Sequence, residues 1–178
     1  HFQLGRPDEA RRELDAALAE GLNPQLRVQA LVALGQIAMD ASDYEQSARY
    51  YEQAVKTVPA DSAAEYGLGT ALSKLEKHDL AKPHLQRSRV LEVQTGRLAE
   101  INRLLAASAR DVSLRLEAAQ ILHSQGFESE AASWMLSVLR YDPRQREAHE
   151  LLARFFEKQG EADLAQLHRA ALRQDGVK

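Results

Sequence analysis

The chain has 178 residues, a formal net charge of −3 and no cysteine. A weakly acidic chain offers no general electrostatic attraction for nucleic acid, and the lack of cysteine excludes disulfides, thiolate metal ligands and a cysteine nucleophile. No apolar run approaches the roughly 20 residues that a membrane-spanning helix requires. We therefore expect no membrane span, while the cellular compartment is left unassigned by the sequence.

Residues 1–24 predict a single helix, which follows Gly5 and has Pro7 in its first turn. Proline is tolerated there because its missing N–H would have no helical partner. The turn residues from Gly21 to Pro24 end the helix. This segment corresponds to the second half of the repeat unit that follows, and the helix that should precede it is missing. We therefore expect the chain to be a piece of a longer protein.

Residues 28–61 and 62–93 carry the same pattern twice, 34 residues apart, and Leu34-Gly35 recurs as Leu68-Gly69. Each copy predicts two helices joined by a short turn, because apolar residues recur at helical spacing on either side of polar turn residues. The first copy turns at Ser42-Asp43 and ends at Pro59. A period of this length indicates a solenoid of stacked repeats.

Residues 94–111 interrupt the period with about 16 extra residues before the pattern resumes at Val112. One alternative is an unpaired extra helix opened by Thr95-Gly96. The other is that the second helix of the 62–93 repeat runs on, which we favour as one long helix over residues 80–106, bent at Gly96. The apolar stripe that supports it consists of Leu91, Thr95, Leu98, either Ile101 or Asn102, and Leu105.

Residues 112–145 and 146–174 complete the pattern, with Gly126 and Gly160 again 34 residues apart. Small residues occupy equivalent positions in the two helices of every repeat, where we expect the paired helices to approach most closely. A large side chain there would overpack the contact at a cost of about 1–3 kcal/mol. The pairs are Gly35 with Ser47, Gly69 with Ala81, Ala119 with Ala131, and Ala153 with Ala165.

The repeat resembles the tetratricopeptide repeat, a helix-turn-helix unit of about 34 residues with the pattern W-x2-L-G-x2-Y…A-x3-F…P. The residues that carry the resemblance are Leu34-Gly35, Asp43-Tyr44, Ala48, Tyr50-Tyr51, Ala54 and Pro59. The resemblance implies an all-α, right-handed superhelical solenoid of antiparallel helix pairs, with about nine helices in one domain over residues 1–178. The repeats are degenerate, because the tryptophan position holds Leu31, Glu65, Arg115 and His149, and the tyrosine position holds Ala38, Leu72, Leu122 and Phe156.

Nothing in the sequence predicts an enzyme, a cofactor or a metal site. A zinc-protease helix needs a second histidine four residues after the first, and Ala153 occupies that position after His149. No glycine-rich phosphate loop is present, and Gly67-Leu68-Gly69 lies inside a predicted helix, where packing explains it. We expect the histidines to face solvent or a groove: His1, His78, His84, His123, His149 and His168.

The resemblance implies that the first helices of the repeats line a concave surface that binds a peptide or a helix, so we expect a protein or peptide partner. The residues that it places in this groove, in repeat order, are Gln29, Val32, Gln36, Met39, Tyr66, Thr70, Ser73, Lys74, Leu116, Gln120, His123, Glu150, Arg154 and Lys158. The leading interpretation is a non-enzymatic protein-interaction scaffold.

Three other hypotheses are weaker. The chain could be an accessory docking domain of a larger enzyme or electron-transfer protein whose active part lies upstream. A basic stretch between Lys82 and Arg110 suggests RNA or lipid binding, but acidic residues interrupt it and no aromatic side chain lies within it to stack on bases. Self-association through the open solenoid ends is also expected, because Leu4, Leu14, Leu18 and Leu172 lack a neighbouring repeat.

Overall fold

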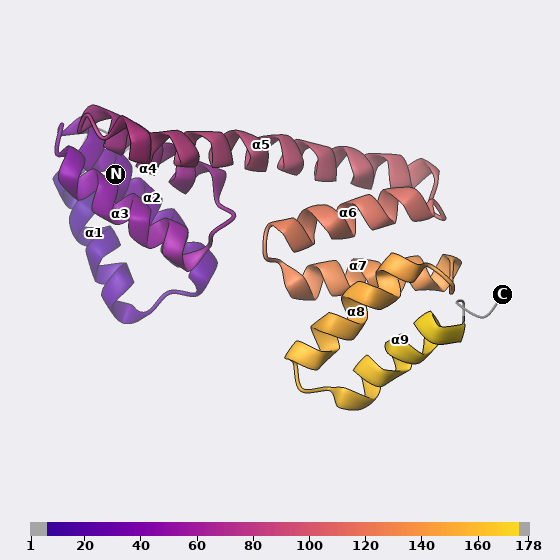
Figure 1. The fold of residues 1–178 in the computed structure, drawn as a ribbon. Coiled ribbons are helices and arrows are strands. Elements are labelled where there is room, and N and C mark those ends of the chain that lie inside the picture. The colour runs from indigo at the N-terminus through magenta and orange to yellow at the C-terminus, as the bar shows by residue number, and fades with distance from the viewer. Residues whose placement is uncertain (1–6, 175–178) are drawn as a thin grey trace. The chain divides into compact units, whose positions relative to one another are not determined.

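The computed structural model describes residues 7–174, and every regular element in that range is an α-helix (Figure 1). The segments with apolar residues at helical spacing form helices joined by short turns. This confirms an all-α helical-repeat solenoid. The nine helices of the described range are α1 (Pro7–Glu20), α2 (Pro24–Asp40), α3 (Tyr44–Thr57), α4 (Ser62–Lys74), α5 (His78–Ala107), α6 (Val112–Ser124), α7 (Glu128–Tyr141), α8 (Arg146–Lys158) and α9 (Ala162–Gln174).

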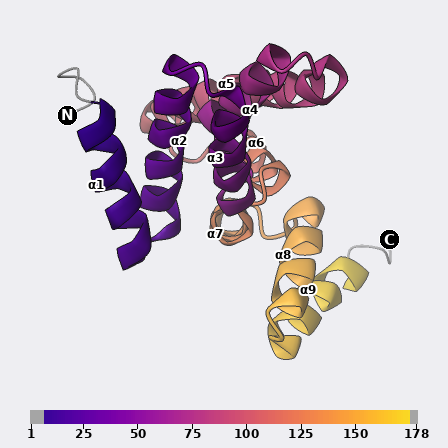
Figure 2. The same ribbon diagram turned by 90° about the vertical axis from the view of Figure 1, so that its left-hand side faces the viewer.

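Two compact units make up the chain, His1–Val93 and Gln94–Lys178, and their boundary falls inside α5. The boundary coincides with the end of the second repeat in the sequence. In the first unit, α1, α2 and α3 lie side by side (Figure 2), and Val28, Leu31, Ala54 and Ala64 form a buried cluster. The second unit has its own cluster around Met135 and Leu152. Burial between neighbouring helices is repeated along the chain, as expected for a solenoid.

Every turn between the two helices of a repeat contains one residue in the left-handed region. The φ angles are 59° at Ser42, 60° at Glu76, 86° at Gly126 and 79° at Gly160. The next residue donates its backbone N–H to the carbonyl of a residue five positions earlier, which caps the end of the first helix. These bonds run from Asp43 to Ala38, Lys77 to Leu72, Phe127 to Leu122 and Glu161 to Phe156, at 2.9–3.0 Å.

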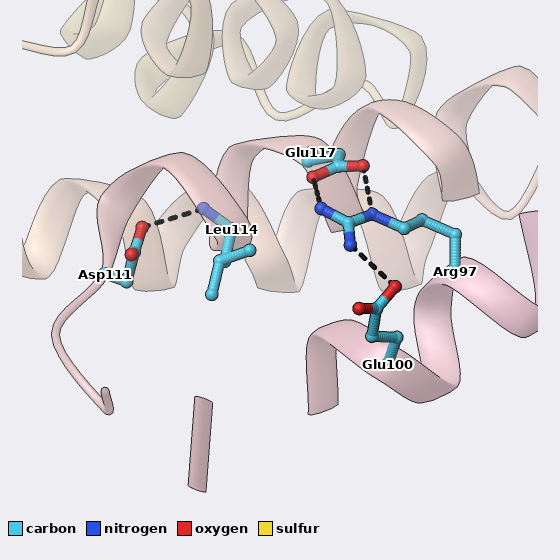
Figure 3. Close-up of polar contacts among 5 residues, drawn as sticks. All are labelled: Arg97, Glu100, Asp111, Leu114 and Glu117. Carbon is cyan, nitrogen blue, oxygen red and sulfur yellow. Dashed lines mark hydrogen bonds and ion pairs between the residues drawn. The ribbon is translucent and has the colours of Figure 1, made fainter. Parts of the chain in front are cut away.

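Asn or Asp side chains start four of the helices by accepting a bond from a first-turn N–H, which would otherwise lack a partner. Asn23 accepts from the N–H of Leu26, Asp43 from Gln46 and Asp61 from Ala64. Asp111 accepts from Leu114 at 3.0 Å (Figure 3). The predicted turns at residues 42–43 and 23–24 therefore have a local physical cause.

The second helix of the 62–93 repeat runs on, as we favoured, and forms the 30-residue helix α5. Its apolar stripe includes Ile101, which is fully buried, and not Asn102, which is exposed. Arg97 fastens this part of α5 to α6 with two bonds to Glu117, at 2.6 and 2.7 Å, and a third to Glu100 (Figure 3). The bonds from Arg97 hold the pKa of Glu117 below its usual value.

Small residues do allow close approach between helices, and large side chains as well as the predicted small partners lie against them. The Ser47 hydroxyl donates to the Gly35 carbonyl at 2.9 Å, so α2 and α3 meet at the predicted pair. The space that a Cβ would need at Gly35 is filled by the Tyr51 ring, which also fills it at Gly67. At Gly69 a Cβ would meet Leu85 first, one helical turn beyond Ala81. The Tyr51 ring therefore packs between Gly35 of α2 and Gly67 of α4.

Candidate partner-binding surfaces

In the second unit, α6, α7 and α8 line an open cavity of about 90 Å³. Its apolar wall contains small alanines from α7, whose size leaves the space open, together with longer side chains of α7 and α8. The apolar residues are Ala131, Ala132, Met135, Leu151 and Phe155. The remaining lining residues are His123, Glu128, Arg154 and Lys158. The cavity thus combines an apolar interior with a polar border.

Three residues of that border belong to the groove predicted from the sequence: His123, Arg154 and Lys158. Lys158 donates to Glu128 at 2.7 Å, which bridges α8 and α7. The side chains of His123 and Arg154 are exposed, and within residues 7–174 neither has a hydrogen-bond or ion-pair partner. They therefore remain available to an acidic or hydrogen-bonding group beside the cavity.

The other three predicted groove residues of this unit make contacts within the fold. Leu116 packs against the buried cluster. Gln120 donates to Glu147 at 2.7 Å, which links α6 to α8. Glu150 accepts from Arg146 on its own helix at 2.9 Å. None of these three side chains lines the cavity.

The predicted groove residues of the first unit are spread along α2 and α4. Gln29, Gln36, Tyr66 and Lys74 are exposed, while the rest are half-buried: Val32, Met39, Thr70 and Ser73. Gln36 donates to Asp40 at 2.8 Å and accepts from the Tyr51 hydroxyl at 3.4 Å. Tyr66, with 61% of its surface exposed, is the large aromatic side chain of this face.

A larger groove of about 540 Å³ lies elsewhere in the first unit, between α3 and the start of α5, with α4 beneath it. The sequence did not point to it, because Leu68 and Leu72 stand out in the sequence only as positions of the repeat pattern. Its twelve lining residues are Glu45, Ala48, Arg49, Glu52, Val55, Lys56, Leu68, Leu72, Leu75, Lys77, Leu80 and His84. None of the predicted groove residues lies in it.

In three of the four repeats the residue at the tryptophan position contacts the residue 19 positions later, on the second helix. Leu31 lies in the buried cluster against which Tyr50 packs, and Glu65 is 2.7 Å from the His84 ring. The Arg115 guanidinium lies 5.9 Å from the centre of the Trp134 ring. In the last repeat His149 and His168 face each other at 2.9 Å. The same position of the repeat thus forms three chemically different pairs.

The expectation that the histidines face solvent or a groove is wrong for His149 and His168, which are buried between α8 and α9. Burial, and then the neighbouring His149, lower the pKa of His168. His78 and His123 are exposed, in agreement with the expectation, and His1 lies outside the described residues. Within residues 7–174, no three or more histidine, aspartate or glutamate side chains lie together in a group that could hold a metal ion.

These helix pairs agree with the comparison against known protein families. A family model described as Tetratricopeptide repeat matches residues 1–41 and 32–89, which together make up half of the 178 residues. The chain belongs to the tetratricopeptide repeat family. Membership in this family supports a role as a protein-interaction scaffold, and tetratricopeptide repeat proteins are generally non-enzymatic.

The solved structures to which this chain is similar include two of MamA and one of YrrB. "Crystal structure of MamA" shares 19% identity over 98% of this chain and 92% of that one, with a TM-score of 0.45. MamA from Desulfovibrio magneticus RS-1 shares 19% over 99% and 91%, with a TM-score of 0.43. YrrB, described as "a TPR protein with an unusual peptide-binding site", shares 16% over 80% and 83%, with a TM-score of 0.39.

A search of curated proteins finds no match to this chain. Among the helices of the described range, none combines the length and the apolar character needed to cross a bilayer.

Proposed function

We propose that the chain is a non-enzymatic interaction scaffold that binds a peptide or helix of a partner protein in its concave groove. The observation that carries the proposal is the cavity between α6, α7 and α8. Three groove residues expected from the repeat pattern, His123, Arg154 and Lys158, border one apolar space of about 90 Å³. A site of this kind joins an apolar anchor point to a few polar groups that set orientation.

The chemistry of the cavity suggests what the bound segment carries. A cavity smaller than the roughly 150 Å³ that holds benzene suits a small aliphatic side chain. Arg154 and His123 have no partner within the described residues, so an acidic group beside that anchor would find a donor. Because the helices are packed before binding, little conformational entropy is lost in forming the site.

Selection from a phage-displayed peptide library on the immobilised chain tests the proposal. We expect the selected peptides to combine an aliphatic residue with a nearby acidic residue. The Arg154→Glu variant should weaken their binding by about tenfold or more, since an attractive charge pair becomes repulsive. The matched control is Arg140→Glu, which changes an exposed arginine of α7 outside the cavity.

Binding that survives Arg154→Glu unchanged, with both variants folded by circular dichroism, contradicts this assignment of the groove.

A further inference from the structure

The groove of the first unit, lined by α3, α4 and the start of α5, is separate from the concave surface. Leu68 and Leu72 of α4 and Leu75 at its C-cap follow each other at steps of four and three residues, so they share one face of the helix. The predicted concave residue Thr70 lies two positions before Leu72, about 200° around the helix. The groove therefore opens on the opposite side of α4, and it does not depend on the proposed function above.

The floor and one edge of this groove are aliphatic. Leu72, Leu75 and Val55 are half-buried, and Leu80 on the edge has 59% of its surface exposed. The side chains from α3 run from Glu45 to Lys56, which corresponds to about 16 Å of helix. The groove has the length of about three helical turns, and its apolar floor is incompletely covered by the chain itself.

The lining restricts the kind of segment that fits. Its twelve side chains are aliphatic or ionisable, and they include no amide and no hydroxyl group. An extended peptide leaves its backbone N–H and C=O groups to be satisfied by the receptor, and burying them without partners is costly. A helix satisfies these groups internally and presents leucine-type side chains at i, i+4 and i+7 to such a floor.

Charges at one end of the groove distinguish its two walls. Glu45 stands in the first turn of α3 and Lys77 just before α5, and both helices follow the turn of their own repeat. Neither side chain has a partner within residues 7–174. The other charges of the walls are partly satisfied: Lys56 binds Glu52, Arg49 binds Gln46, and His84 binds Glu65. One wall therefore offers a free carboxylate and the other a free ammonium group.

We propose that this groove binds an amphipathic helix of a partner protein. Its leucine-type residues lie on Leu72, Leu75 and Leu80, and near one end it carries a basic residue facing Glu45 and an acidic residue facing Lys77. The helix packs between α3 and α5 as a ridge in a groove, like the helices of the solenoid itself. The two charges near one end favour one direction of the helix, because a reversed helix moves its charges to the other end of the groove and loses both ion pairs.

A fluorescently labelled synthetic helix with this pattern is the probe, titrated with the full chain and followed by anisotropy. We expect saturable binding that Leu80→Glu weakens at least tenfold, since a charge enters the apolar edge. Leu167→Glu on α9 is the matched control, because Leu167 is 63% exposed and lies outside the groove. Arg154→Glu should also leave this binding unchanged, which separates the result from the test of the proposed function.

A second variant examines the pairing of charges across the groove. The double variant Glu45→Lys with Lys77→Glu should prefer a probe with its two end charges exchanged, by about tenfold over the original probe. Both substituted positions are exposed, so the fold is retained.

Three results would overturn the proposal: no binding of the probe at millimolar concentration, equal binding by the Leu80→Glu variant, or no change of preference in the double variant. A fourth is a dimer of the unmodified chain that Leu80→Glu dissociates in sedimentation, because a second copy would then occupy the groove.

Discussion

The Nδ1 atoms of His149 and His168 lie 2.9 Å apart between α8 and α9, in a pair buried from solvent. The Nε2 atom of His149 lies 3.0 Å from the Pro143 carbonyl and must donate to it, so in the neutral ring its Nδ1 accepts. His168 therefore donates from Nδ1, and its ring stacks on Phe156 with an angle of 1° between the planes. The two rings join the helices of the last repeat through this bond.

Because of this buried pair, we expect acid to lower the free energy of unfolding. The pKa of His168 is lowered by burial and by His149, so below the usual histidine pKa the unfolded chain binds a proton that the folded chain does not. The free energy of unfolding should then fall as the pH drops through about 6.5. Among the described residues neither ring forms an ion pair with a carboxylate that would offset this loss. Urea unfolding followed by circular dichroism at about pH 7.5 and about pH 5.5 measures it.

The variant His168→Phe removes the titrating ring, so its stability should depend less on pH over the same range. His123→Gln, at an exposed histidine of α6, is the control and should behave like the unmodified chain. If His168→Phe retains the full pH dependence, the acid effect comes from other groups.

Two glycines in helices should respond in opposite directions to alanine. A Cβ at Gly96 in α5 would meet no atom within 4 Å, whereas one at Gly69 would lie 2.7 Å from the Leu85 side chain and 3.1 Å from its backbone nitrogen. Gly96→Ala should raise the free energy of unfolding by about 0.5–1 kcal/mol. Gly69→Ala should lower it by about 1–3 kcal/mol through overpacking. Chemical denaturation of both variants checks the pair, and equal effects of the two substitutions would contradict it.

We expect Glu76 to lower the free energy of unfolding, because a non-glycine residue takes a left-handed backbone conformation there, with φ of 60°. The equivalent residue in the third repeat is Gly126, at φ of 86°. We expect Glu76→Gly to raise the midpoint of thermal unfolding, with a gain below about 1 kcal/mol after the added freedom of the unfolded chain. The reciprocal change Gly126→Ala should destabilise by about 1 kcal/mol. A lower midpoint for Glu76→Gly would refute the assignment of strain.

Tyr51 makes the first unit sensitive to alkali. Burial, and then the negative charge of Asp40, raise the pKa of Tyr51 to about 12. Between about pH 10 and about pH 12 the unfolded chain loses this phenolic proton while the folded chain keeps it, so stability should fall as the pH rises through that range. Tyr51→Phe should reduce this loss, and the exposed Tyr66→Phe should not. Urea midpoints across the alkaline range, compared between the two variants, measure the difference.

Local patterns predicted most of the elements. The 34-residue period predicted helix pairs, and turn residues such as Ser42-Asp43 predicted their boundaries, because helix periodicity and capping depend on neighbours a few residues away. The apolar stripe through Leu91 and Leu98 predicted the long α5 for the same reason. It left Ile101 and Asn102 undecided, since both lie close to one helix face and only packing against other helices selects Ile101.

For the candidate sites, sequence reasoning reached three border residues of one cavity, His123, Arg154 and Lys158, through their place in the repeat. It missed the groove over Leu72 because an apolar residue at helical spacing has the same pattern whether a neighbour covers it or not. Whether that residue is covered depends on how far α3 and α5 stand apart, which is set by side chains distant in the chain.

The sequence by itself determined the repeat family, the order of helices and the long helix, since each depends on spacing along the chain. Only the tertiary structure decided what each repeated position contacts. The positions of Glu65, Arg115 and His149 are equivalent in sequence, yet they face a histidine, a tryptophan and a second histidine. The physical reason is that the repeat spacing specifies the helix face on which a side chain lies. The environment of that side chain depends on which residue of another helix packs against it.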